Sequence, residues 1–159
     1  ENNESVADGR PNPNEPRVAL EREVLKARLQ MADLVKGWDE IESEAFTHPA
    51  YRQLRTVIDA HGPSTMRMDQ IENANMKALI AELSVEPIRA EGEISERYVE
   101  SIVARLREVT KSRAIAELKS TLQRLNPVTN ETEYTVLFTE LVRLEAARRT
   151  LHDLAIGEL

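Results

Sequence analysis

The chain has 159 residues, a net charge of −7 and no cysteine. Disulfides, thiol chemistry and cysteine-based zinc sites are therefore excluded. The net negative charge argues against direct binding of duplex DNA, because most of the affinity for DNA comes from contacts between basic residues and phosphates. Apolar runs stay well short of the roughly 20 residues that cross a bilayer, and the sequence does not open with a signal peptide. We therefore expect a cytoplasmic protein without membrane contact.

Residues 1–16, ENNESVADGRPNPNEP, are polar and rich in proline, which predicts the end of a disordered linker. From residue 17 the pattern turns helical. Val18, Leu25 and Leu29 fall on or near one helical face, which predicts the first helix of a packed body.

The stretch EAFTHPAYRQL, residues 44–54, contains His48 among two aromatic residues and a proline. Thr47 is predicted to cap a helix in which Pro49 occupies the first turn, where its missing N–H costs nothing. This helix is expected to end at His61, since a glycine and a proline follow. The stretch raises the question of whether its histidine is catalytic, metal-binding or structural.

Shorter helical segments fill the rest of this half. MADLVKGW, residues 31–38, predicts a short helix, and another is expected over residues 66–73. MKALIAELSV, residues 76–85, predicts a third that a proline ends. Ser95 is then predicted to cap a long helix.

The long helix carries two apolar stripes that are out of line. The first ends at Val109 and the second begins at Ile115, and at about 100° per residue this step shifts the stripe around the helix. We therefore expect the two halves of the helix to pack against different bodies. The stripes comprise Val99, Ile102, Val103, Leu106 and Val109, and then Ile115, Leu118, Leu122 and Leu125.

A second long helix follows an Asn-Pro break, with Asn130 and Glu133 as a predicted capping box. Its apolar residues recur at steps of three and four, as in coiled coils, which predicts an antiparallel hairpin with the preceding helix. The predicted seam contains Tyr134, Leu137, Leu141, Leu144, Leu151 and Ala155.

Together these elements predict an all-α fold in which one long helix joins an N-terminal helical bundle to a C-terminal antiparallel hairpin. The expected boundaries are 1–16 for the linker end, 17–110 for the bundle and 111–159 for the hairpin.

Sequence motifs for catalysis are missing. The sequence has no glycine-rich phosphate loop, HExxH or DxDxDG loop, and its histidines lack carboxylates at metal-ligand spacing. We therefore expect no catalytic residue, metal site or cofactor in this chain. The acidic pair Glu21 and Glu23 is assigned to a helix start or a solvated face.

FTHPAYR (46–52) and AELKSTLQRLNP (116–127), with LIAELSVEPIRAEGE and RYVESIVARL between them, carry a resemblance. Over residues 17–159 the chain resembles the C-terminal domain of bacterial replicative DNA primase in its actinobacterial form. The resemblance implies a non-catalytic domain that binds the replicative helicase and recruits primase to the replication fork. Zinc and magnesium would belong to N-terminal domains outside this chain. The resemblance makes His48 structural, and the candidate helicase contacts are Val128, Tyr134, Thr135, Val136 and Phe138.

The same resemblance implies a second partner, the acidic C-terminal tail of single-stranded DNA-binding protein. In the family, basic and aliphatic residues of the first helix hold this tail, and the matching positions are Arg17, Arg22 and Leu25. A further basic contact lies just before the long helix in the family. Here that position reads Gly-Glu, and Arg97 is expected to substitute.

Two other functions compete with this interpretation. The N-terminal assembly domain of a replicative helicase has a similar bundle, but a helicase is expected to continue into a nucleotide-binding domain. A small helical enzyme or regulator would need a His/Asp or His/Cys cluster, which the sequence lacks.

Overall fold

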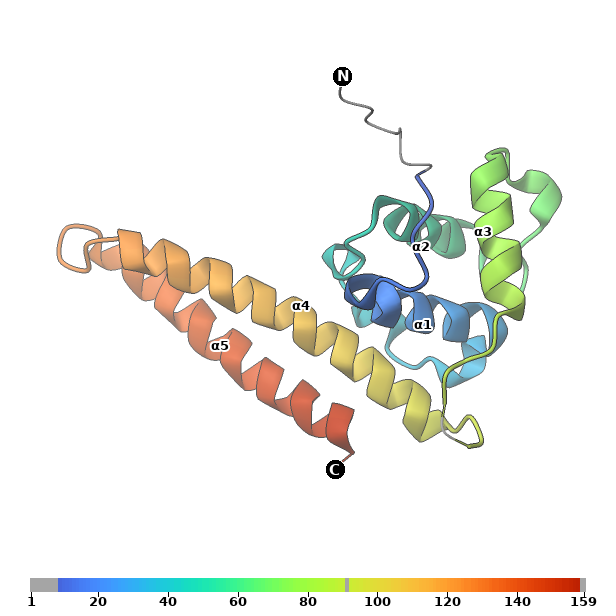
Figure 1. Cartoon of the computed structure of the whole chain (residues 1–159). Helices are drawn as coiled ribbons and strands as arrows, with labels where there is room; N and C mark the ends of the chain where they lie inside the picture. Colours follow the sequence, from blue (N-terminus) through green and yellow to red (C-terminus); the bar gives the residue numbers. More distant parts are fainter. Residues whose placement is uncertain (1–8, 91, 158–159) are drawn as a thin grey trace, which may run out of the picture.

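The structure is a computed structural model that describes residues 9–90 and 92–157, apart from the side chain of Arg17. Within this part of the chain it is all-helical, as predicted (Figure 1). A compact bundle holds the first three helices, and a long two-helix arm extends from it. The helices are α1 (Pro16–Gln30), α2 (Pro49–His61), α3 (Ala74–Val85), α4 (Glu96–Arg124) and α5 (Glu131–Ile156).

Helix α1 lies at the centre of the bundle, and residues 21–27 are buried on every side of it. Helices α2, α3 and the first half of α4 surround it, together with the turns of residues 31–46. The core is therefore built around one helix, so even its polar positions are buried. Core side chains include Val24, Leu25, Phe46, Tyr51, Leu54, Leu83, Val99 and Leu106.

Two predicted helices are wrong. Residues 31–38 form two 3-10 turns, Ala32–Leu34 and the start of Trp38–Glu40, separated by Gly37 at φ 74°. Residues 66–73 contain only the 3-10 turn Met68–Gln70. Each segment is too short for its hydrogen bonds to offset the entropy of helix nucleation.

Some helix caps also differ from the predictions. Ser95 caps α4 as predicted, accepting a hydrogen bond from the N–H of Tyr98 at 3.1 Å. Helix α2, however, is capped by His48 and not by Thr47. Asn130 makes no side-chain cap for α5. Instead the Oδ1 of Asn126 accepts the N–H of Val128 at 2.8 Å and so shapes the loop before α5.

Helices α4 and α5 run antiparallel along the whole arm (Figure 1). The predicted seam is present, and its most buried members are Ile115, Leu122, Leu144, Leu151 and Ala155. Val109, which was assigned to the first stripe, is 44% exposed and belongs to neither core. Its neighbour Thr110 is buried instead, with its hydroxyl donating to the carbonyl of Leu106 at 2.9 Å.

The first half of α4 contacts both bodies. One side contributes Val99, Val103 and Leu106 to the bundle core. On another side, the Ser101 hydroxyl donates to the carbonyl of Ala155 at 3.0 Å, so α5 returns beside the bundle half of α4. The hairpin seam therefore continues past residue 110 into the bundle half of α4, where buried Ala155 lies beside Ser101.

Basic residues at the middle of α4 fasten it to the turns of the bundle. Arg107 pairs with Glu40 at 3.1 Å, and Lys111 pairs with Glu42. Arg113 donates to the carbonyl of Glu44 at 3.2 Å. These contacts mark the last point at which α4 touches the bundle before the arm projects from it.

Candidate interaction surfaces

His48 is structural, as the resemblance implied. Its Nδ1 accepts the N–H of Ala50 at 3.1 Å and caps α2. The turn before the helix is held by the buried carboxylate of Glu21, which accepts both the N–H and the hydroxyl of Thr47 at 2.6 Å. The N–H of His48 donates to the same carboxylate at 3.3 Å. The histidine therefore fixes the entry of the chain into α2.

The assignment of Glu21 and Glu23 to a solvated face was wrong, because both are buried. Glu23 pairs with buried Lys26 at 2.7 Å and accepts the N–H of Arg89. The Tyr98 hydroxyl lies 3.3 Å from the same carboxylate. Burial and the Glu23 charge raise the pKa of Tyr98 to about 12. Glu23 thus joins α1 to the segment that leads into α4.

Arg22, a predicted contact for the acidic tail, is only 3% exposed. Its guanidinium donates to Glu86 at 2.7 Å, to Glu82 at 2.8 Å and to the Tyr51 hydroxyl at 3.1 Å. Burial alone would lower the pKa of Arg22, but these hydrogen bonds outweigh burial and raise it above its usual value. Arg22 therefore links α1 to α2 and α3, and its positive charge is already paired with the carboxylates of Glu82 and Glu86.

The other predicted tail contacts are not gathered on one surface. Leu25 is fully buried in the bundle core and offers no apolar contact to a peptide. The side chain of Arg17 lies outside the described residues. Arg97 is exposed at the start of α4, where it donates to the carbonyl of Gly157 at the end of α5. The apolar periodicity of α1 could not show that Arg22 and Leu25 are both buried, since periodicity shows only where apolar residues recur.

The predicted helicase contacts all lie at the outer end of the hairpin, on α5 and the loop before it. Val136 and Phe138 are two residues apart and therefore point about 200° apart around the helix. Val128 stands on the loop at 82% exposure, and Val136 and Phe138 on α5 are 62% and 50% exposed. The ring of Tyr134 stacks on that of Phe138 with centroids 6.4 Å apart. Phe138 is therefore not a core residue of the hairpin. Its exposed ring is available to a partner.

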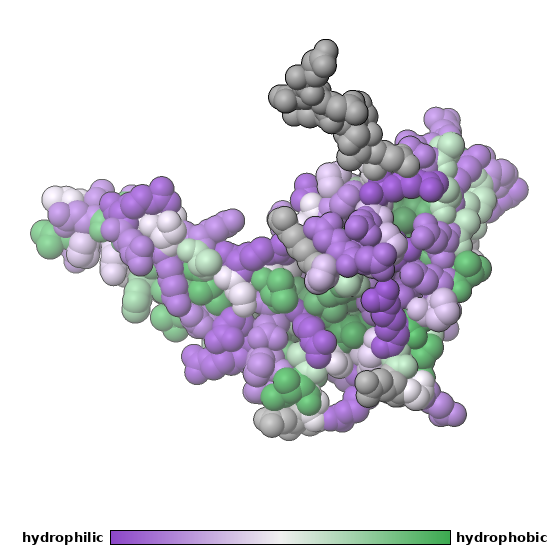
Figure 2. All heavy atoms as spheres, in the orientation of Figure 1, coloured by the Kyte–Doolittle hydropathy of each residue, from purple (hydrophilic) through white to green (hydrophobic). Residues whose placement is uncertain are grey.

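One further residue of this end was missed. Val142 is 55% exposed and lies one helical turn beyond Phe138, on the same side of α5. Thr135 lies on that side too, so Thr135, Phe138 and Val142 form a continuous strip, named here the α5 strip. Figure 2 shows hydrophobic residues along the α5 side of the arm. The four-residue spacing from Phe138 was the signal that could have identified Val142.

The described residues contain neither a candidate metal site nor a candidate membrane-spanning helix. Within residues 9–90 and 92–157, no group of three or more His, Asp or Glu side chains is arranged to hold a metal ion. In the same part of the chain, no helix is both long and apolar enough to span a membrane.

Comparison with known proteins identifies the family. The family model for the DnaB-binding region of DNA primase DnaG matches residues 21–137. The chain is 39% identical over 160 residues to the DNA primase of Mycobacterium leprae and 40% identical over 161 residues to that of Mycolicibacterium smegmatis. These alignments cover 94% of this chain and 25% of each relative, so the chain spans about a quarter of their length.

A solved structure supports the same assignment. The helicase binding domain of primase from Mycobacterium tuberculosis matches with a TM-score of 0.70 at 38% identity, covering 88% of this chain and 94% of that one. The matches are to primases, so the alternative of a helicase assembly domain is set aside. Family model, relatives and structure agree: the chain belongs to the DnaB-binding family of DNA primase DnaG.

Proposed function

We propose that this chain is the part of a DNA primase that binds a DnaB-type replicative helicase and so recruits primase to the replication fork. The observation that carries the proposal, together with family membership, is the exposed α5 strip at the end of the arm. Its apolar side chains are not needed for the hairpin seam, which is formed by other residues of α5. Exposed apolar strips on a rigid helix are suited to docking in a groove of a partner.

The direct test is calorimetric titration of the 159-residue chain into the replicative helicase of the same organism. Saturable binding is expected, and its absence would remove the proposal. The chain is expected to take no cofactor and to perform no chemistry itself. Primer synthesis by the pure chain would contradict that expectation.

Phe138→Ala is expected to weaken helicase binding tenfold or more, because a buried aromatic anchor is often worth about 2 kcal/mol or more and each ~1.4 kcal/mol is a factor of ten. The melting temperature should stay close to that of the wild type, since the ring is half exposed. Ile156→Ala is a matched control, because Ile156 is 51% exposed on the same helix but lies at its opposite end. Equal affinity of the Phe138 variant and the wild type would exclude the α5 strip as the contact.

A second part of the proposal is that the bundle binds the acidic tail of single-stranded DNA-binding protein. It rests on the resemblance and on the exposed guanidinium of Arg97. Burial of Arg22 and Leu25 argues for a site formed without direct contact from either side chain.

Arg97→Ala is expected to weaken the binding of a synthetic tail peptide about tenfold or more, because charge-assisted hydrogen bonds contribute about 1.5–3 kcal/mol and each ~1.4 kcal/mol is a factor of ten. The loss should be larger at low salt, since exposed pairs are screened over about 10 Å at 0.1 M. Fluorescence anisotropy of the labelled peptide measures both effects, with Arg149→Ala, an exposed arginine of α5, as the control. An unchanged affinity would remove Arg97 from the tail site.

A further inference from the structure

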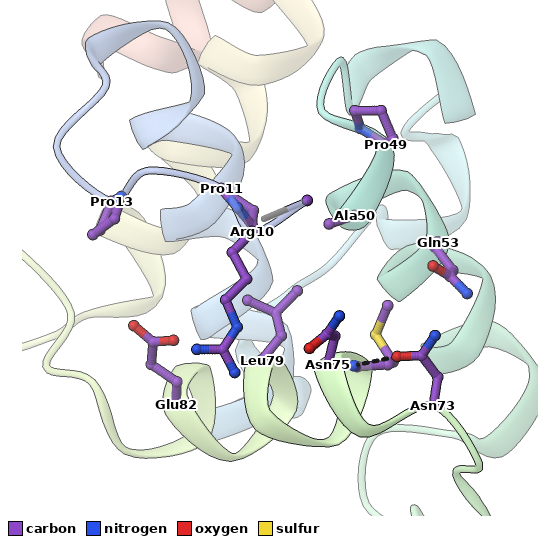
Figure 3. Close-up of a pocket in the computed structure, with 12 residues that line it drawn as sticks. Arg10, Pro11, Pro13, Pro49, Ala50, Gln53, Asn73, Asn75, Leu79 and Glu82 are labelled. Atoms are coloured by element: carbon purple, nitrogen blue, oxygen red, sulfur yellow. Dashed lines mark hydrogen bonds between the residues drawn. The ribbon is translucent and has the colours of Figure 1, made fainter. Parts of the chain in front are cut away.

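A cavity of about 370 Å³ opens between α2 and α3, on the bundle and not on the arm (Figure 3). Its floor is apolar, formed by the buried side chains of Met76 and Leu79 from α3. Ala50 and Gln53 from the start of α2 line the opposite side. The cavity is thus a groove with an apolar floor and a more polar rim, which suits an extended peptide.

The remaining wall of the groove is the segment Gly9–Pro13, named here the N-terminal strap. This segment was predicted to be part of a disordered linker, but Pro11 is buried against the bundle. A turn that begins at Asn12 and is centred on Pro13 and Asn14 ends the strap, and the N–H of Asn14 donates to the Asn12 side chain at 3.0 Å. Residues 1–8 of that predicted linker lie outside the described residues.

The chemistry of the strap matches that of a bound peptide. Proline has a fixed φ and no N–H, so an extended proline segment loses little entropy on docking and leaves few donors unsatisfied. Pro11 is the buried anchor, and Arg10 extends over the groove in the direction of Glu82 (Figure 3). Glu82 also pairs with Arg22 of α1 at 2.8 Å.

We propose that the apolar floor between α2 and α3 is a peptide-binding surface that the chain's own strap partly covers in cis as one wall of the cavity, with Pro11 as the anchor. The strap is a removable cover: its release exposes the floor around Met76 to a competing extended peptide. This site is separate from the α5 strip, so the inference does not depend on helicase binding.

The methionines provide the test. The chain has four, and only Met76 lines this groove, whereas Met68 is 38% exposed and serves as an internal reference. In the full 159-residue chain with labelled methionine methyl groups, a soluble paramagnetic agent should broaden Met68 strongly and Met76 weakly. Replacing Arg10–Pro13 with four glycines keeps the chain length and should move the broadening of Met76 toward that of Met68.

Pro11→Asp is the finer variant, because it adds a charge only at the anchor. Pro127→Asp, in the exposed loop before α5, is the matched control and should leave Met76 shielded. A peptide with the sequence of residues 9–15, GRPNPNE, should restore the shielding of Met76 when it is added to the tetraglycine variant. We expect a dissociation constant on the order of 1 mM, since one side chain supplies most of the buried contact. The peptide GRSNSNE should have no effect.

Four results would overturn the inference. Met76 could be as accessible as Met68 in the wild type, or it could stay shielded in both strap variants. The peptide could also fail to restore shielding at several times the expected dissociation constant. Loss of cooperative melting in both strap variants would contradict it as well, because a removable cover is not required for folding.

Discussion

Removal of residues 125–159 is expected to leave a bundle that melts cooperatively and to abolish helicase binding. The bundle core contains no residue beyond Leu106 among the described residues, so the deletion removes none of the residues that form this core. The seam residues Ile115 and Leu122 lose their partners, and the second half of α4 is expected to fray. The helicase-binding proposal places its main contacts on α5, which the deletion removes.

Two measurements separate these expectations. Thermal unfolding followed by circular dichroism should show one cooperative transition with a reduced helical signal. A broad, non-cooperative transition would mean that the hairpin is part of the bundle's folding unit. Retained affinity for the helicase in calorimetry would mean that the contact lies on the bundle.

Arg22→Glu is expected to destabilise the bundle by about 3–5 kcal/mol, because it breaks a buried ion pair and leaves like charges together. Glu82 and Glu86 both hydrogen-bond to this guanidinium and would face a third carboxylate. The Tyr51 hydroxyl would also lose its donor. A net stability of about 5–15 kcal/mol is typical of a domain, so this loss is a large fraction.

Urea unfolding measures this effect, with Arg149→Glu as a charge-reversal control on an exposed part of α5. The control should change the free energy of unfolding by less than about 0.5 kcal/mol. A stable Arg22→Glu variant would contradict the buried network. The prediction also means that reversal of Arg22 would weaken tail binding through unfolding, so Arg97 is the better probe of the tail site.

The hairpin was largely predictable because its packing is local in sequence. Residues such as Leu144 and Leu151 recur with the three- and four-residue steps of a two-helix seam, and the Asn-Pro pair marks the reversal of the chain. Family motifs then identified the domain. The exposure of Phe138 was left open by the sequence, since neighbours on either side of a seam residue look alike until the partner helix is placed.

The polar interior of the bundle was not predictable from these patterns. Glu21 reaches Thr47 across 26 residues, and Glu23 reaches Arg89 across 66. Hydrophobic periodicity assigns charged residues to solvent, and that rule fails for α1 because neighbours surround it. The predicted tail pocket was affected for the same reason, since Arg22 serves the fold instead.

The continuity of α4 has a mechanical consequence. The helix runs unbroken from Glu96 to Arg124, and among the described residues its last hydrogen bond to the bundle is made by Arg113. Beyond that residue the arm extends by about 17 Å, at roughly 1.5 Å for each residue. A tilt of about 10° at the bundle would therefore move the outer end by roughly 3 Å, about half a helical turn. The orientation of the arm relative to the bundle therefore sets the position of its outer end, and the ion pairs of Arg107 and Lys111 help to fix that orientation.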